Sequence, residues 1–470
     1  MGVTRRSLIS APFLWLPSRS AGRRTNVVAF MTDDHGAWAM GAYGCRDMRT
    51  PNLDQLAAEG ARFTRAYACS PIDSPSRMSY LTGLIPSQHG VQDDLLDEDS
   101  YGTRSRRFLD GHVTYSEILA KNGYTLGMSG KWHMGDDTHA QRGFSYWHAM
   151  PGAGGTYRDP EFYTNGAHRK LFGFKTDLVA DGAIEFLDHS KDKPFYLLVN
   201  FNAPHEPYDY QPDRDREPYR GCEFGCFPAE DPNPNQNPVF ARLAHKKESK
   251  LAYSALVTGV DRNVGRILRR LERLKLRDDT LIIFTADQGW NAGHHGIWGR
   301  GNGTIPFNLY EESIRVPMIW NHPGHIRSGH VVTPMVASYD FFPTILDYLG
   351  LPPHHDPKLA GRSYASFLRG RPPNWSNRLY FEYSYMRGVR TETLKYIERT
   401  KDWPSELYDL EADPGESENV IRDAGYTKAL AALRAEMGKF FQDRGAPPLA
   451  DWRNTTKQNL PIYSLRKAAK

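Results

Sequence analysis

Cysteine is scarce in this sequence of 470 residues, which contains only Cys45, Cys69, Cys222 and Cys226. Four cysteines are too few to form a disulfide scaffold in a chain of this length. Three residues separate Cys222 from Cys226, so these two could close a small loop in an oxidising compartment. No second close pair accompanies them, which argues against a four-ligand zinc site.

The net charge of the chain is also small, and its sequence contains no internal repeat. The chain holds 59 Lys and Arg against 55 Asp and Glu, a formal charge of +4. Three of the basic residues, Arg5, Arg6 and Arg19, lie in the first 22 residues, which contain no acid. The remainder is almost neutral, which gives no electrostatic case for a nucleic-acid partner. We find no repeat of fixed period and no low-complexity tract.

The sequence contains no apolar run of the about 20 residues that a helix needs to cross a bilayer. Its N-terminus carries a twin-arginine pattern, Thr4-Arg5-Arg6-Ser7-Leu8, followed by a short apolar run over residues 8–16. Small residues at 18–22 supply a cleavage region. We therefore predict that residues 1–22 are a signal segment and that the protein is exported, to the periplasm or outside the cell. The alternative is a basic tail without a targeting role.

Strands and helices are predicted to alternate along most of the chain. Four short apolar runs, each followed by a polar cluster, are typical of buried parallel strands: residues 26–31, 124–129, 195–201 and 280–285. Helical patterns occupy residues 51–59, 116–121, 177–188, 251–274 and 339–349. This alternation predicts an α/β sheet, in which ligands bind beyond the carboxyl ends of the strands. Residues 206–237 read as a long surface loop beside that edge.

The composition changes near residue 370, at Arg371-Pro372-Pro373. Short antiparallel strands are indicated at residues 379–384, 388–390 and 394–398, and an amphipathic helix at residues 426–443. We therefore divide the chain after the signal segment into a larger unit, residues 23–374, and a smaller α+β subdomain, residues 375–470.

Two of the predicted strands end in pairs of oxygen-bearing side chains. Asp33 and Asp34 follow the first strand, and Asp287 and Gln288 follow a later one. A single acid at such a place is usually a helix cap or a solvated turn. Two pairs at one sheet edge instead suit a hard cation such as Ca²⁺ or Mg²⁺, which prefers oxygen ligands. The sequence therefore predicts that these four side chains bind one divalent cation.

Five ordered motifs and the C-terminal ending resemble those of the sulfatases. The motifs are Asp33-Asp34, Ser74-Pro75-Ser76-Arg77 with Leu81-Thr82-Gly83, Gly130-Lys131-Trp132-His133-Met134-Gly135, Ala203-Pro204-His205, and Thr285-Ala286-Asp287-Gln288-Gly289 with Gly293-His294-His295-Gly296. The ending is Glu406-Leu407-Tyr408-Asp409-Leu410 with Asp413-Pro414. The resemblance implies an alkaline-phosphatase-like fold, with a large mixed, mostly parallel sheet flanked by helices, in a catalytic domain over residues 23–374. It also implies a calcium-dependent hydrolase whose substrate is a small-molecule or glycan sulfate ester.

The sequence departs from this family at the nucleophile. Sulfatases carry the pattern Cys or Ser, any residue, Pro, any residue, Arg, and the first residue is oxidised to formylglycine. The frame set by Pro75, Arg77 and Thr82-Gly83 puts Asp73 at that position, where formylglycine is not expected. Cys69-Ser70-Pro71 imitates the start of the pattern, but Asp73 then falls where its Arg should be.

Three roles are open for Asp73. It could attack the ester and form a covalent intermediate, act as a base on a metal-bound water, or only bind the metal. A divalent cation and three basic side chains against four carboxylates give the site a formal charge of about +1, which suits one monoanionic ester.

The resemblance assigns roles to five further side chains. Arg77 would hold the nucleophile and the metal site, Lys131 would bind a sulfate oxygen, and His133 would polarise the nucleophile. His205 would protonate the leaving oxygen or contact the sulfate. Arg300 stands where the family usually has a Lys that touches the ester, and it can bind two oxygens where Lys offers one point charge.

Two other functions stay open. A phosphodiesterase or phosphonate hydrolase on the same fold would use the same cation, Arg and Lys, although a dianionic phosphate monoester fits a site of charge +1 less well. The other alternative is a catalytically silent protein that binds an anion or a glycan. Such a protein would not need Lys131, His133 and His205 as an acid–base set.

Overall fold

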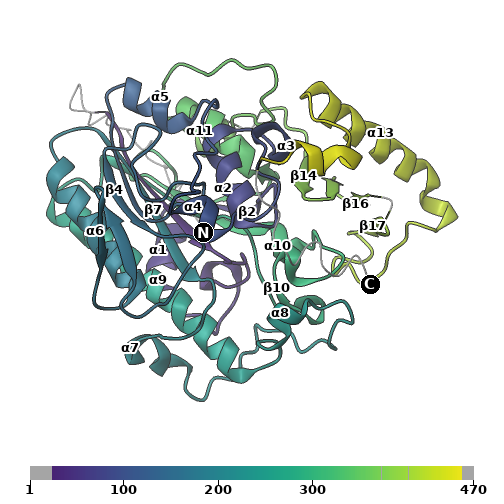
Figure 1. Cartoon of the computed structure of the whole chain (residues 1–470), viewed down its shortest axis with the longest axis horizontal. Coiled ribbons are helices and arrows are strands. Elements are labelled where there is room, and N and C mark those ends of the chain that lie inside the picture. The colour runs from purple at the N-terminus through teal and green to yellow at the C-terminus, as the bar shows by residue number, and fades with distance from the viewer. Residues whose placement is uncertain (1–23, 372, 401, 458–470) are drawn as a thin grey trace, which may run out of the picture.

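The computed structural model describes residues 24–371, 373–400 and 402–457 (Figure 1). The predicted signal segment, residues 1–22, lies outside these ranges, so export stays a prediction. Within the described residues, no helix combines the length and the apolar character needed to cross a membrane.

An eleven-stranded sheet forms the centre of the molecule, in the order β12-β2-β11-β8-β1-β7-β3-β4-β5-β6, with β13 also pairing with β2. Strands β8, β1, β7, β3 and β4 are parallel, whereas β11 is antiparallel to both of its neighbours. The sheet is therefore mixed and mostly parallel, as expected. The strands are β1 (Asn26–Asp33), β2 (Ala61–Tyr67), β3 (Thr125–Lys131), β4 (Tyr146–Met150), β5 (Glu161–Thr164), β6 (Ala167–Lys170), β7 (Phe195–Pro204), β8 (Thr280–Ala286), β11 (Arg315–Asn321), β12 (His330–Val332) and β13 (Val336–Ala337).

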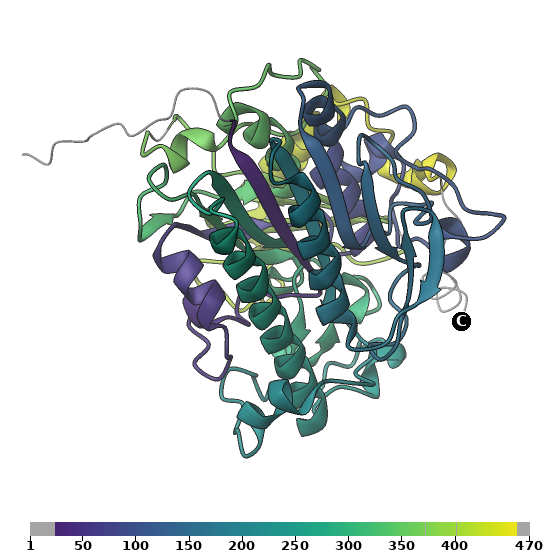
Figure 2. The ribbon, with the colours of Figure 1, turned by 90° about the vertical axis from the view of Figure 1, so that its left-hand side faces the viewer.

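Helices cover both faces of the sheet, which explains why its central strands are continuously apolar. Val28 and Phe30 of β1 pack into one core cluster with the long helices α6 (Lys175–Ser190) and α9 (Lys247–Arg273). Figure 2 shows these two helices side by side across that face. Val27 and Ala29 point the other way, into a cluster with α2 (Asp73–Thr82), α5 (Tyr115–Lys121) and α11 (Phe341–Tyr348). The core therefore has two layers, one on each side of the sheet.

A small antiparallel sheet lies near the C-terminus, beside the main sheet (Figure 1). It consists of β14 (Leu379–Tyr383), β15 (Met386–Arg390), β16 (Leu394–Arg399) and β17 (Glu406–Asp409), with α13 (Thr427–Asp443) packed against it. Its buried Lys395 donates to the backbone oxygen of Leu309 at 2.7 Å and pairs with Glu311 and Glu416. These contacts fix the small sheet to the segment that leads into β11.

Short elements complete the chain. They are α1 (Pro51–Ala58), α3 (Pro86–His89), α4 (Asp97–Ser100), α7 (Asp213–Arg216), α8 (Pro238–Ala241), α10 (Glu311–Ile314), α12 (Ala365–Leu368), α14 (Trp452–Thr455), β9 (Asn291–Ala292) and β10 (Trp298–Gly299).

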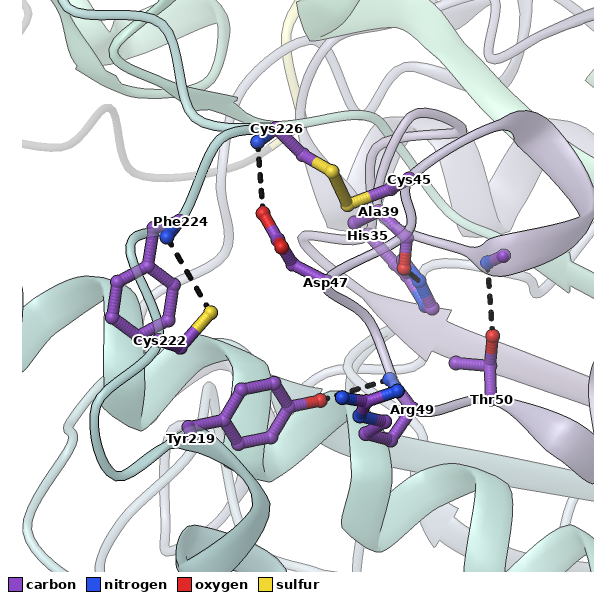
Figure 3. Close-up of a disulfide and its surroundings, with 11 residues drawn as sticks. His35, Ala39, Cys45, Asp47, Arg49, Thr50, Tyr219, Cys222, Phe224 and Cys226 are labelled. Atoms are coloured by element: carbon purple, nitrogen blue, oxygen red, sulfur yellow. Dashed lines mark hydrogen bonds between the residues drawn. A yellow bond between two sulfur atoms is a disulfide. The ribbon is translucent and has the colours of Figure 1, made fainter.

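The sequence left open whether Cys222 pairs with Cys226, and the structure shows that it does not. Cys226 instead forms a disulfide with Cys45, whose Cα lies 5.5 Å away, and Cys222 is free (Figure 3). Asp47 accepts a hydrogen bond from the Cys226 amide at 3.0 Å, which holds the loop over residues 206–237 against the segment that follows β1. Phe224 packs into the same cluster as Cys45. Cys226 therefore pairs with Cys45 because the aromatic loop over residues 206–237 packs against the segment that contains Cys45, and not because the two cysteines are close in sequence.

We expect Cys45→Ser to lower the free energy of unfolding by about 2–5 kcal/mol, because this disulfide joins residues 181 positions apart and restricts the unfolded chain. Chemical denaturation of the oxidised protein measures the loss. Cys222→Ser is the matched control and should change stability by less than about 1 kcal/mol, since Cys222 is half-buried and outside the disulfide. Equal effects of the two substitutions would contradict the assigned disulfide.

Candidate active site

The predicted site residues converge at the carboxyl edge of the parallel strands. Asp33 and Asp34 lie at the end of β1, Lys131 ends β3, His205 follows β7, and Asp287 follows β8. Apart from the half-buried His205, these side chains are fully buried. Asp34, which lies just past the end of β1, has a positive φ of 61°, a conformation that is unfavourable for Asp and that concentrates at functional sites.

Asp73 enters the site from the N-terminus of a helix. It is the first residue of α2, which begins after Ile72, so its carboxylate lies where the helix dipole favours negative charge. Cys69, by contrast, packs in an apolar cluster, where burial raises the pKa of its thiol to about 11. The geometry of α2 therefore brings Asp73, and not Cys69, into contact with the other site residues.

Lys131 lies between two carboxylates. Its ammonium group donates to Asp33 Oδ2 at 2.6 Å and to Asp73 Oδ2. Burial disfavours ionisation of Asp73, but the charge of Lys131 and the hydrogen bond from His133 outweigh it, so the pKa of Asp73 lies well below its usual value. The second oxygen, Asp73 Oδ1, has no hydrogen-bond partner among the described residues, and Arg300 Nη2 lies 3.7 Å from it.

Two arginines bind the remaining carboxylates. Arg77 Nε and Nη2 both contact Asp287 Oδ2, at 2.8 and 2.7 Å, and its Nη1 donates to the backbone oxygen of Lys131. Arg300 Nη1 lies 2.7 Å from each oxygen of Asp34. Both guanidinium groups are buried, so each ion pair stays largely unscreened by water.

His133 has acceptors at both ring nitrogens. Its Nδ1 lies 2.9 Å from Asp73 Oδ2, and its Nε2 lies 3.1 Å from the backbone oxygen of Leu95. Each ring nitrogen can donate to its oxygen when it carries a proton, so these two contacts fix the orientation of the ring beside the Asp73 carboxylate. The backbone amide of His133 donates to Asp137, which fixes the positive φ of this residue.

His205 lies at the partly open side of the site. Its Nδ1 donates to the backbone oxygen of Glu206, which leaves Nε2 directed at Asp34 Oδ2, 3.8 Å away. Burial lowers the pKa of His205 to about 4, although the charge of Asp33 opposes the shift. The ring is therefore neutral near pH 7 in the free protein and has an accepting Nε2.

The acidic cluster has the composition of a divalent cation site. Oxygens of Asp33, Asp73 and Asp287 lie within 4.8 Å of one another, and Asp34 joins Asp33 and His205 in a second such group. Gln288 Nε2 contacts Asp33 and Asp34 at 3.1 and 2.8 Å, and its Oε1 has no partner among the described residues. Burial raises the pKa of Asp34 to about 8 and that of Asp287 well above its usual value. The five residues proposed from the sequence therefore offer carboxylate and amide oxygens that are crowded together and buried, a set that fits a hard cation.

Asp94 also contacts this site, although no sequence motif pointed to it. One of its oxygens lies 3.6 Å from Arg300 Nη2, and it forms a group with Asp73 and His133. Burial and the nearby Asp73 raise its pKa well above the usual value. The only sequence signal was a second acid pair, Asp93-Asp94, in a loop where acids are common.

A buried acid–base cluster of this kind at the carboxyl edge of an α/β sheet is typical of a hydrolase. The chain belongs to the sulfatase family: the family model described as Sulfatase matches residues 25–351. A second model, described as N-sulphoglucosamine sulphohydrolase, C-terminal, matches residues 306–443. The resemblance stated from the motifs and the alkaline-phosphatase-like fold are thereby confirmed.

Relatives with known names support the same family. The chain is 29% identical to N-acetylglucosamine-6-O-sulfatase of Bacteroides thetaiotaomicron, over 91% of this chain and 88% of that protein. A solved protein in complex with its substrate D-glucosamine-2-N,6-O-disulfate matches with a TM-score of 0.76 and 26% identity, over 90% of this chain and 98% of that one. The phosphonate monoester hydrolase of Agrobacterium radiobacter matches with a TM-score of 0.69 and 22% identity, over 90% and 96%, and shows the shared fold.

Proposed function

We propose that this protein is an exported, metal-dependent hydrolase of sulfate esters, in which Asp73 stands at the position of the formylglycine precursor. The observation that carries the proposal is the placement of the Asp73 carboxylate at a helix N-terminus, in contact with Lys131 and His133 and close to Arg300. The named relative that cleaves a sulfated sugar supports a glycan or small-molecule sulfate ester as substrate. The Cys45–Cys226 disulfide supports export, because such bonds persist in oxidising compartments.

Export has a direct check. Mass spectrometry of the mature protein from the native host should find residues 1–22 removed. Retention of Arg5 would contradict export.

In this proposal, Asp33, Asp34, Asp73, Asp287 and Gln288 would hold Ca²⁺ or Mg²⁺, which when bound would supply positive charge that attracts and polarises the ester. The chain's own groups do the rest. Lys131 and Arg300 bind the sulfate oxygens, as their charge and burial allow. Arg77 holds Asp287 and, through the Lys131 backbone, the Lys131 side chain in place.

The proposal assigns Asp73 the role of nucleophile. Its low pKa keeps it ionised, as a nucleophile must be, and its Oδ1 has no hydrogen-bond partner among the described residues. Asp73 Oδ1 would form a bond to sulfur as the bond from sulfur to the leaving oxygen breaks. His205 would donate the proton that the leaving oxygen needs, once the anionic ester raises its affinity for a proton. Water then hydrolyses the sulfated Asp73 and releases sulfate.

A panel of sulfate, phosphate and phosphonate esters, assayed with Ca²⁺ and with a chelator, tests the function. We expect weak but measurable turnover of monoanionic sulfate esters, and loss of that turnover when the metal is removed. Preferred turnover of phosphate diesters or phosphonate monoesters would favour the alternative hydrolase. Calcium binding without turnover of any ester would favour the catalytically silent protein.

Calcium should also stabilise the fold. At about 1,000 times its Kd, a cation that binds only the folded state raises the free energy of unfolding by about 4 kcal/mol. Thermal unfolding with Ca²⁺ and with a chelator measures this difference. In Asp34→Asn the calcium-dependent shift should be lost. In the control Asp340→Asn it should persist, because the buried Asp340 accepts backbone amides elsewhere in the fold. A shift that survives in Asp34→Asn would contradict the cation site.

A further inference from the structure

A polar cleft of about 530 Å³ opens beside His205. Its walls are the start of α4, the glycine-rich residues 151–156, the paired ends of β5 and β6, and residues 205–207. Because His205 also faces Asp34 of the buried cluster, the cleft lies next to the reacting groups. It is large enough for a sugar-sized group.

The cleft is acidic. Four carboxylates line it against two side chains with permanent positive charge, and His205 is neutral near pH 7. Glu206 pairs with Arg242 at 2.8 Å. Glu161 lies opposite Lys170 in the β5–β6 ladder.

The remaining two acids, Asp97 and Asp159, give the cleft its excess negative charge. Asp97 is exposed and bonds the Ala153 amide at 3.2 Å. Asp159 has Arg158 at 4.0 Å, but this arginine is 70% exposed and therefore offers little compensation.

The glycine-rich wall presents backbone rather than side chains. Lys175, buried beneath it, donates to the carbonyl oxygens of Gly154 and Gly155. Burial lowers the pKa of Lys175 to about 7, so it adds only a fraction of a positive charge from below. Backbone groups, carboxylates, Thr156 and Tyr101 offer hydrogen bonds to hydroxyl groups, and the Tyr101 ring, Ala153 and three prolines add apolar surface against which a sugar ring can pack. This mixed lining suits a hydroxyl-rich group better than a wholly apolar one.

Charge therefore changes sign along the path of the substrate. At the inner end, Lys131 and Arg300 together with the cation of the proposed function would attract an anion, whereas Asp97 and Asp159 repel one at the outer end. We propose that the cleft is the leaving-group subsite and selects a hydroxyl-rich alcohol, such as a sugar, that carries the ester sulfate as its only anionic group. This inference rests on the proposed sulfate-ester hydrolysis and adds the selectivity for singly charged substrates.

A matched pair of substrates tests this selectivity. One is an O-sulfate ester of N-acetylglucosamine, and the other is the same ester with an N-sulfate in place of the acetyl group. We expect kcat/KM to be about tenfold higher for the first at low ionic strength, and the ratio to shrink as salt screens the cleft. The double variant Asp97→Asn/Asp159→Asn should reduce the ratio about fivefold, whereas Lys170→Glu should increase it.

Asp443→Asn is the control for loss of one surface acid, because Asp443 lies on α13, outside the cleft. It should leave the ratio unchanged. Equal kcat/KM for the two sugars, or a ratio that the double variant does not alter, would overturn the inference while the proposed function stood. No turnover of any sulfate ester, including aryl sulfates, would overturn the proposed function and the inference together.

Discussion

Asp73→Asn is expected to lower kcat on sulfate esters by at least about 10³-fold, and Asp73→Ala by a similar factor. The amide keeps the size of the side chain and can still contact Lys131 and His133, but it cannot attack sulfur. The loss should therefore appear in kcat and leave KM within a few-fold. Steady-state kinetics with one monosulfated sugar and one aryl sulfate measures both constants. Mass spectrometry of the quenched wild-type enzyme should find a sulfuryl group on the peptide that contains Asp73.

The control for this change is Asp340→Asn, another fully buried carboxylate that lies outside the site. It should lower stability without a comparable loss in kcat. If Asp73→Asn and Asp73→Ala both keep full turnover, Asp73 is neither nucleophile nor base. A gain of activity in Asp73→Cys that occurs only in a host with formylglycine machinery would show that the rest of the family's site is intact.

The strand ends that form the site could be predicted because they lie on continuously apolar strands. Residues 26–31 and 280–285 are buried on both faces, and that pattern also fixes which residues reach the carboxyl edge. Asp33 and Asp287 are brought to one place by sheet order alone. The register of Pro75 and Arg77 selected Asp73 over Cys69 as the start of the motif, and the structure has Asp73 as the first residue of α2.

Other features depend on contacts that no local pattern encodes. Strand β2 was not predicted because polar residues such as Arg62 and Arg65 interrupt its apolar alternation. Strand β11 was not predicted although it is mostly apolar, because it contains Pro317, where its pairing with β2 shifts register. The disulfide partner of Cys226 lies 181 residues away. Which cysteine pairs with Cys226 depends on how the loop over residues 206–237 packs against the segment that follows β1. The contact of Asp94 with Arg300 arises in the same way, between two loops.

Lys131→Met is expected to damage stability and activity together. The methionine keeps most of the side-chain volume but leaves Asp33 and Asp73 without the ammonium group that lies between them. Removal of one partner from a buried ion pair costs about 3–5 kcal/mol, because the remaining charge stays buried and uncompensated. The sulfate also loses a charged contact, so kcat/KM should fall about 10²–10³-fold.

Lys395→Met separates the two effects. Lys395 is equally buried and pairs with Glu311 and Glu416, but it holds the small C-terminal sheet rather than the site. It should cost a similar free energy of unfolding and leave kcat/KM within a few-fold at temperatures where the protein is folded. Calcium should stabilise Lys131→Met more than wild type, because the cation then compensates the carboxylates of Asp33 and Asp73 that have lost the ammonium group between them. An activity loss in Lys395→Met as large as that in Lys131→Met would mean that Lys131 acts through folding alone.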